Sequence, residues 1–285
     1  MKKYAPCTES GGWRHISYSS DLLLVQGVSD NLMSHLCSLL SSSIPTEATA
    51  AQQKSYVTYA LSSLGSQDEG PPSITLLETR NLLAAGGTTG LRTWEAALHL
   101  GEYVCGNYPH LIRGRAVLEL GAGTGYISIL CARHLGASYV VATDGSEDVV
   151  TNLTDNFKLN GLQDASIIHA KELKWGCPLA DGDHSEEAGS KQIDLVLAAD
   201  VTYDETATAA LITTFEDIFD RCPGAKVIIA ATLRNSKTYS FFQETCHKKA
   251  YNFEEIDFGI RPNKLQTGPF YPDKVPIRIC RISRP

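Results

Sequence analysis

The chain has 285 residues, of which 43% are hydrophobic and 20% charged, and its formal net charge is −7. This composition is typical of a globular protein large enough for one large domain and an appendage. It contains neither a run of lysine and arginine nor an apolar stretch of membrane-spanning length, which argues against nucleic-acid binding and against membrane insertion.

Three further expectations follow from the sequence. No cleavable signal pattern is present, so we expect a cytosolic or nuclear protein and take the cytoplasm as its compartment. No exposed apolar face stands out, which favours a monomer. The eight cysteines lack any Cys-x-x-Cys pair, so we expect reduced thiols rather than disulfides or a metal site.

Residues 1–72 are expected to form a helical N-terminal extension. A polar start is followed by one or two helices, in which four leucines recur at helical spacing and are expected to pack: Leu32, Leu36, Leu39 and Leu40. Residues Thr46–Leu64 are expected to form another helix, and the Gly- and Pro-rich residues 65–72 a linker.

The pattern of residues 73–285 predicts one α/β domain. After an amphipathic helix at Leu91–Tyr103, short β-branched runs alternate with longer amphipathic segments, the pattern of βαβ units. The expected strands are Ala116–Leu120, Tyr139–Thr143, Ser166–Ala170, Ile193–Ala198 and Lys226–Ala231. The expected helices are Gly125–Leu135, Ser146–Leu159, Glu205–Phe219 and Ser236–Lys249. The acidic residues 178–192 are expected to form a loop.

Two more strands, Phe253–Phe258 and Val275–Arg281, are joined by a Pro- and Gly-rich loop rather than by a helix. Strands without a crossover helix must pair antiparallel. The predicted fold is therefore a doubly wound, seven-stranded, mostly parallel sheet with an antiparallel last strand.

The stretch "VLELGAGTG" at residues 117–125 has the form of a strand, a glycine turn and the start of a helix. Such a turn lets a ligand approach the backbone and the helix N-terminus. The dinucleotide fingerprint would require glycine at position 126, where the chain has Tyr126. Glu119, two residues before Gly121, would repel a pyrophosphate but attract an ammonium group. S-adenosylmethionine carries an ammonium and a sulfonium.

Asp144 ends the second strand and is placed to accept hydrogen bonds from ribose hydroxyls. Together Glu119, the glycine turn and Asp144 favour S-adenosylmethionine over NAD. Trp175 is a candidate for packing on the adenine and Trp94 has a similar status, although both can equally be core residues.

The segment "LAADVTYDE" follows the fourth strand, beside the crevice of a doubly wound sheet. It lacks the prolines that are common in methyltransferases for base amino groups. Asp200 and Tyr203 offer a carboxylate and an aromatic wall, which suit a cationic amine such as lysine. Asp200 could instead cap the following helix, but Asp204 is the better candidate for that role.

Five stretches together resemble the seven-strand protein-lysine methyltransferases, and within them the elongation factor 2 lysine methyltransferase family. They are "GGTTGLRTWEAALHL" at residues 86–100, "VLELGAGTG", "TDGS" at 143–146, "LKWG" at 173–176 and "DVTYD" at 200–204. The resemblance covers about residues 75–285 and implies a Rossmann-like class I methyltransferase domain.

The resemblance also implies the site and its partners. It implies S-adenosylmethionine as cofactor, methylation of a lysine of translation elongation factor 2, and recognition of that substrate by the N-terminal extension. The implied active-site motif is Asp200 and Tyr203. The implied cofactor residues are Trp94, Glu119, Gly121, Gly123, Asp144, Trp175 and Ala199.

Three other interpretations remain open from the residues. The same fold and cofactor could serve another acceptor, namely histidine, a protein N-terminus or a small molecule. The chain could be a non-catalytic module that binds translation factors. An NAD oxidoreductase ranks last, because Tyr126 breaks its fingerprint.

Overall fold

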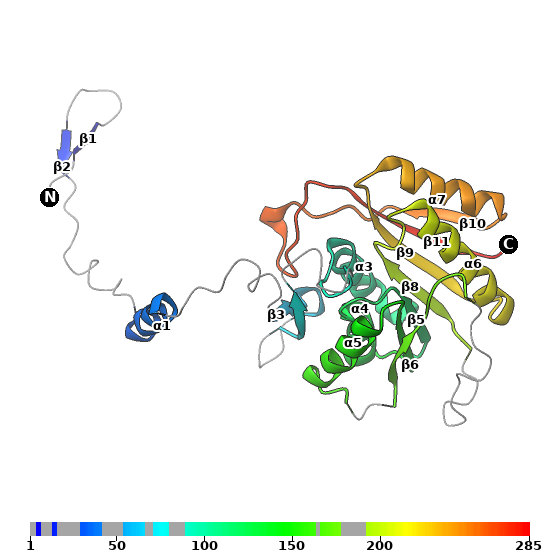
Figure 1. Ribbon diagram of the computed structural model, residues 1–285. Helices are drawn as coiled ribbons and strands as arrows, with labels where there is room; N and C mark the ends of the chain where they lie inside the picture. The colour runs from blue at the N-terminus through cyan, green and yellow to red at the C-terminus, as the bar shows by residue number, and fades with distance from the viewer. Residues whose placement is uncertain are drawn as a thin grey trace. The chain divides into compact units, whose positions relative to one another are not determined.

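A computed structural model describes residues 4–6, 13–15, 29–41, 54–65, 71–79, 89–163, 166–177 and 192–285; for 4–6, 13–15 and 108 it describes the backbone alone. The chain divides into two compact units, residues 1–48 and 49–285. In the first unit, β1 (Tyr4–Pro6) pairs antiparallel with β2 (Trp13–His15), and α1 (Asp30–Ser41) confirms one expected helix (Figure 1). The four leucines of α1 are exposed, so the expectation that they pack is wrong.

The helix expected at Thr46–Leu64 is also wrong. Its described part contains β3 (Lys54–Ala60) and a 3₁₀ turn, η2 (Ser62–Leu64), while residues 46–53 lie outside the described ranges. β3 forms an antiparallel hairpin with β4 (Ser73–Thr79). The sequence of β3, KSYVTYA, is rich in β-branched and aromatic residues, which fit a pleated strand better than a helix. The expected boundary near residue 72 therefore falls inside a hairpin of the second unit.

The second unit contains the predicted seven-stranded sheet. Its strands are β5 (Ala116–Leu120), β6 (Tyr139–Asp144), β7 (Ile168–Glu172), β8 (Leu195–Ala199), β9 (Lys226–Thr232), β10 (Asn252–Ile256) and β11 (Ile277–Ser283). They lie in the order β10-β11-β9-β8-β5-β6-β7. Neighbours among β5 to β9 pair parallel, whereas β11 pairs antiparallel with both β9 and β10. The fold class predicted from the sequence is confirmed.

Helices cover both faces of this sheet (Figure 1). One face packs against α3 (Glu95–Leu111), α4 (Tyr126–Ile129) with its π-helical continuation η3 (Leu130–His134), and α5 (Glu147–Leu159). The other packs against α6 (Glu205–Arg221) and α7 (Ser236–Lys248). A loop with one 3₁₀ turn, η5 (Asn263–Leu265), joins β10 to β11. Because side chains alternate along a strand, Val117 enters the first core and Leu118 the second.

The strand order creates a crevice between β5 and β8. From β5 the chain proceeds to β6 and β7 on one side, and then crosses to β8 and β9 on the other. Ligands of doubly wound sheets bind at the carboxyl ends of the strands where the order reverses in this way. The glycine turn follows β5 and the "DVTYD" segment follows β8, so both lie at this crevice.

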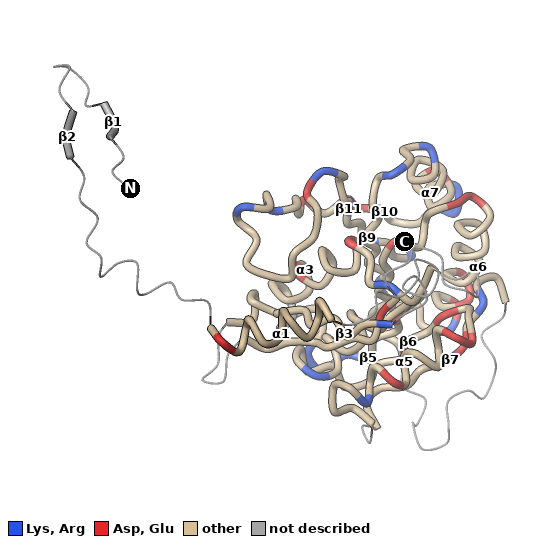
Figure 2. Tube along the Cα trace, turned by 60° about the vertical axis from the view of Figure 1, so that its left-hand side comes forward, with Lys and Arg blue, Asp and Glu red and all other residues tan. Residues whose placement is uncertain are grey.

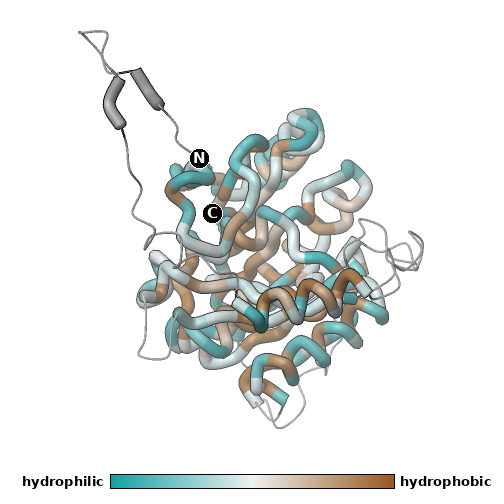
Figure 3. The backbone as a smooth tube through the Cα atoms, turned by 90° about the vertical axis from the view of Figure 1, so that its left-hand side faces the viewer, coloured by the Kyte–Doolittle hydropathy of each residue, from teal (hydrophilic) through white to brown (hydrophobic). Residues whose placement is uncertain are grey.

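Charge and hydropathy both alternate along the chain of the second unit. Acidic and basic residues are interspersed along the second unit (Figure 2). Hydrophobic and hydrophilic stretches alternate along the helices, as expected for amphipathic helices that cover a sheet (Figure 3). None of the described helices is long and apolar enough to cross a membrane.

Two asparagines on α5, together with Asn160 at its C-terminal cap, attach the β3–β4 hairpin to the domain. Asn160 exchanges hydrogen bonds with the backbone N–H and carbonyl of Thr75, at 3.1 and 2.7 Å. Asn156 accepts from Leu77 N at 2.7 Å and donates to Thr124 O in the glycine turn at 2.9 Å. Asn152 donates to Leu77 O at 3.2 Å. One helix face thus holds both the edge of β4 and the turn.

We predict that Asn156→Ala lowers the free energy of unfolding by about 2 to 3 kcal/mol, because it leaves an N–H and a carbonyl without their partner. Urea unfolding measures this loss. Asn252→Ala is the control, since exposed Asn252 makes one 3.3 Å bond to Arg284 O and should cost about 0.5 kcal/mol or less. Equal losses in the two variants would contradict a special role for the α5 asparagines.

Candidate functional site

The turn after β5 has a backbone that only glycine adopts readily. Gly121, Gly123 and Gly125 have φ values of 67°, 55° and 84°, in the left-handed region. A Cβ on Gly121 would lie 3.0 Å from Val201 Cγ1 and 3.1 Å from Trp175 Cζ2. The structure therefore brings Trp175 against the glycine turn, next to the segment that follows β8.

Asp144 supports the turn from the neighbouring strand. Its Oδ2 accepts from Gly123 N at 3.1 Å and its Oδ1 from Ser146 N at 3.2 Å. Burial raises the pKa of Asp144, while these backbone N–H groups oppose the rise. Each carboxylate oxygen has a second lone pair available for a ligand hydroxyl. The structure thus places Asp144 at the turn, as the sequence predicts.

Glu119 lies beneath the turn and is only 3% exposed. Its Oε2 accepts from Ser128 N at 2.9 Å and from the Ser128 hydroxyl, and Ser128 lies in α4, which follows the turn. Burial raises the pKa of Glu119 to about 8, and the Ser128 bonds and the Asp144 charge modify this effect. Because the carboxylate faces Ser128, direct contact between Glu119 and a ligand ammonium stays a prediction.

Asp200 follows β8 with an unusual backbone φ of 55°. Its Oδ1 accepts from Thr232 N at 2.8 Å, and its Oδ2 from the Thr232 hydroxyl at 3.0 Å and from Arg234 Nη1 at 3.2 Å. The carboxylate is thus fixed to the end of β9. Sequence reasoning singled out Asp200 but missed both partners, since neither Thr232 nor Arg234 belongs to a motif.

Tyr203 and Asp204 have different surroundings. Tyr203 is 65% exposed, and partial desolvation together with the charges of Asp204 and Asp144 raises its pKa. The "DVTYD" segment contacts the turn through Val201, whose Cγ1 lies 3.0 Å from where a Cβ on Gly121 would be. Asp204 caps α6 by accepting from Ala207 N at 2.7 Å, as predicted.

Trp94 directly precedes α3 and is surrounded by the charged side chains of Arg92, Glu95 and Arg234. Its indole N–H donates to Thr89 O at 3.1 Å. The guanidinium carbons of Arg234 and Arg92 lie 4.9 and 5.2 Å from its ring centroid. Glu95 pairs with both arginines, at 3.1 Å to Arg234 and 3.4 Å to Arg92. Through Arg234 the structure connects Trp94 with Asp200.

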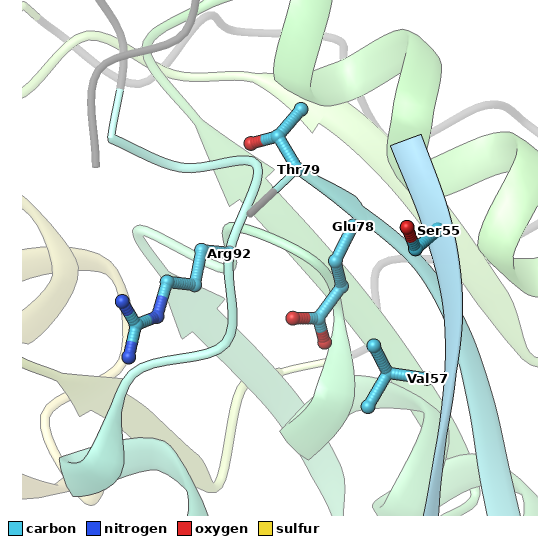
Figure 4. A pocket seen from close by; sticks show the side chains of 5 residues that line it. All are labelled: Ser55, Val57, Glu78, Thr79 and Arg92. Carbon is cyan, nitrogen blue, oxygen red and sulfur yellow. The ribbon is translucent and has the colours of Figure 1, made fainter. Parts of the chain in front are cut away.

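A cavity of about 350 Å³ adjoins this cluster. Figure 4 shows its lining from β3, β4 and the segment before α3: Ser55, Val57, Glu78, Thr79 and Arg92. Buried Glu78 accepts from the Thr93 hydroxyl at 2.6 Å, and Thr93 Oγ1 lies 2.6 Å from Thr124 Oγ1 in the glycine turn. Sequence reasoning missed Glu78, because it assigned no strand to the hairpin that carries it. Gly87 and Thr88 of the preceding motif lie outside the described residues.

The arrangement has two parts at one edge of the sheet. The turn and Asp144 offer backbone N–H groups and a carboxylate to a ligand with hydroxyls. Ala199 ends β8 and directly precedes Asp200 in the chain. Asp200 and Tyr203 offer a carboxylate and an exposed aromatic ring to a second molecule. Over the ranges that the structure describes, no three potential metal ligands gather in one place.

Comparison with known families decides between the interpretations. A family model described as "Lysine methyltransferase" matches residues 79–248, more than half of the chain. The chain belongs to this lysine methyltransferase family. The match includes the glycine turn, Asp144 and the "DVTYD" segment, so it coincides with the site described above.

Curated relatives agree with this family. The protein-lysine N-methyltransferase EFM3 of Chaetomium thermophilum is 48% identical over 90% of this chain and 76% of its own length. EFM3 of Saccharomyces cerevisiae is 32% identical over 74% of this chain and 66% of its own length. The protein-lysine N-methyltransferase EEF2KMT of Mus musculus is 31% identical over 65% of this chain and 56% of its own length. The enzyme class of the chain is therefore protein-lysine N-methyl transfer.

We predict that Gly121→Ala destabilises this methyltransferase more than Gly161→Ala does. Both glycines have a positive φ, near 70°, but a Cβ on Gly161 meets nothing within 4 Å. Both variants carry a backbone cost of about 1 to 2 kcal/mol, and Gly121→Ala adds about 1 to 3 kcal/mol of overpacking against Val201 and Trp175. Chemical denaturation of both variants tests the difference, and equal losses would show that the turn is not tightly packed.

We also predict that Glu119 makes the stability of the protein depend on pH. The pKa of Glu119 rises from 4.5 to about 8 on folding, so between these values the native state holds a proton that the unfolded state has lost. Stability therefore falls as the pH rises through this window, by as much as about 1.4 kcal/mol per pH unit from this group.

Glu119→Gln isolates this contribution, because the amide oxygen can still accept from Ser128 but cannot ionise. Denaturant unfolding at pH 5, 6.5 and 8 should show that the variant gains stability relative to the wild type as the pH rises. A constant difference between the two proteins would contradict the raised pKa.

Proposed function

We propose that this chain transfers methyl groups from S-adenosylmethionine to a lysine of translation elongation factor 2. One observation carries the proposal. The glycine turn and Asp144 lie at the carboxyl ends of the sheet strands, and Asp200 and Tyr203 follow the carboxyl end of the neighbouring strand β8. Val201 of the "DVTYD" segment lies against the turn, 3.0 Å from where a Cβ on Gly121 would be, so a methyl donor at the turn would lie close to an acceptor at this segment.

The residues at the turn fit the cofactor. The glycine backbone lets a ligand approach α4, and each oxygen of Asp144 can accept a bond from a ribose hydroxyl. Trp175 lies against Gly121, where a flat ring can pack on the adenine. We assign the remaining cofactor contacts to Glu119, Gly123, Ala199 and Trp94. When bound, S-adenosylmethionine supplies an electrophilic methyl group on a positive sulfur.

The acceptor must present a free electron pair. A lysine ammonium has an ordinary pKa of about 10.4, so it has to lose a proton first. Burial against Tyr203 near a positive sulfonium would lower this pKa, and Asp200 would orient the amine. Asp200 is well suited to this role because Thr232 holds its carboxylate in one position.

Sequence similarity supports the choice of substrate. The stretch "GGTTGLRTWEAALHL" resembles the elongation factor 2 lysine methyltransferases, and a relative is the mouse protein-lysine N-methyltransferase EEF2KMT. The same resemblance supports substrate recognition by residues 1–72. An enzyme that modifies a translation factor would act in the cytoplasm, and we propose that it does so as a monomer.

The decisive experiment supplies radiolabelled S-adenosylmethionine and the purified protein to an extract from cells that lack it. We expect one labelled band at the size of elongation factor 2 and, in a digest, label on a single lysine. Asp200→Asn should reduce the label at least tenfold, because an amide neither attracts the ammonium nor accepts its proton.

Asp220→Asn is the matched control. Asp220 forms a surface ion pair with Arg284 at 2.5 Å, away from the sheet edge, so its variant should label normally. Label on another protein would keep the enzyme class and overturn the substrate. Label on a residue other than lysine would overturn the acceptor, and the absence of cofactor binding by calorimetry would overturn the proposal.

A further inference from the structure

Arg234, which belongs to none of the sequence motifs, binds the carboxylate of Asp200. Arg234 follows β9, and its Nη1 lies 3.2 Å from Asp200 Oδ2 while its Nη2 lies 3.1 Å from Glu95 Oε2. Its guanidinium carbon lies 4.9 Å from the ring centroid of Trp94. A cation of the chain itself is therefore held between two carboxylates and an aromatic ring.

These surroundings are those that would attract a substrate ammonium, because carboxylates and aromatic faces bind cations in general. The geometry points to Arg234 as a stand-in for the substrate: its guanidinium occupies the cation position on Asp200, and the incoming lysine displaces it. This inference rests on the proposed function, since it concerns how a lysine reaches Asp200.

The guanidinium of Arg234 is accessible enough for such an exchange. Its side chain is 47% exposed, so water can solvate the guanidinium as it leaves Asp200. After leaving Asp200, Arg234 can keep its bond to Glu95 and its place over Trp94. Arg92 already pairs with the other oxygen of Glu95, so it does not compete for Asp200.

Asp200 does not depend on Arg234 for its position. The Thr232 N–H and hydroxyl bind its two oxygens at 2.8 and 3.0 Å, and its own N–H donates to Ala230 O at 2.9 Å. Its side chain is 10% exposed. Loss of the guanidinium therefore leaves an ordered carboxylate without its counter-charge, and it also removes the cation that bridges Asp200 and Glu95. A substrate lysine should bind such a site more tightly.

Steady-state kinetics of the full chain test this exchange, with purified elongation factor 2 as the acceptor. We expect Arg234→Gln to lower the KM for elongation factor 2 about threefold to fivefold, while the KM for S-adenosylmethionine changes less than twofold. Arg234→Lys should give an intermediate KM, because one ammonium cannot bridge Asp200 and Glu95 as the planar guanidinium does. A residue with a merely structural role would not lower the KM on removal.

Arg281→Gln is the matched control, since it removes the same charge from an ion pair with Glu254 at 2.9 Å on another part of the sheet. Its KM for elongation factor 2 should equal that of the wild type. An unchanged or higher KM in both Arg234 variants would overturn the inference, as would an equal fall in Arg281→Gln. Thermal melting checks that each variant is folded, and Arg234→Lys decides the question if Arg234→Gln does not fold. Failure of the proposed function looks different, because the wild type itself would not methylate elongation factor 2.

Discussion

The site depends on hydrogen bonds that hold the glycine turn after β5 from several directions. β6 provides Thr143 O for Ala122 N at 2.8 Å and Asp144 for Gly123 N. α5 provides Asn156 for Thr124 O. Because the three left-handed glycines contribute no side chains, these bonds from β6 and α5 help to define the shape of the turn. A turn held in this way keeps its backbone open toward a ligand.

Three carboxylates around this turn differ because their surroundings differ. Glu119 is buried beneath it and has a pKa raised to about 8, so the stability of the protein depends on pH through this group. Asp144 is bonded to backbone N–H groups and remains partly accessible. Asp200 is bonded to Thr232, the last residue of β9, and to Arg234, which follows β9. Asp144 ends β6 and Asp200 directly follows β8, so both lie at the carboxyl ends of strands, where ligands of this type of sheet bind.

The β3–β4 hairpin connects to the same turn by a second route. Glu78 on β4 binds Thr93, and Thr93 contacts Thr124, so the hairpin reaches the turn through side chains as well as through the α5 asparagines. The hairpin also contributes four of the five residues that line the cavity near Arg92. A segment that resembled a linker and helix in the sequence is thus part of the domain that carries the site.

The sequence by itself determined the strands of the sheet, their mostly parallel pairing and the identity of the turn, Asp144 and Asp200 as candidates. These features are local: buried β-branched runs, glycines at fixed spacing and acids at strand ends are visible within a few residues of one another. The β-branched and aromatic residues of Lys54–Ala60 favour a strand, but only the tertiary structure decided that this strand pairs with Ser73–Thr79 in a hairpin that α5, far along the chain, holds in place. It also decided the partners of Asp200 and the place of Arg234, which lies 34 residues beyond Asp200. Contacts between strand ends arise from the order in which strands pair, and no periodicity within one segment records that order.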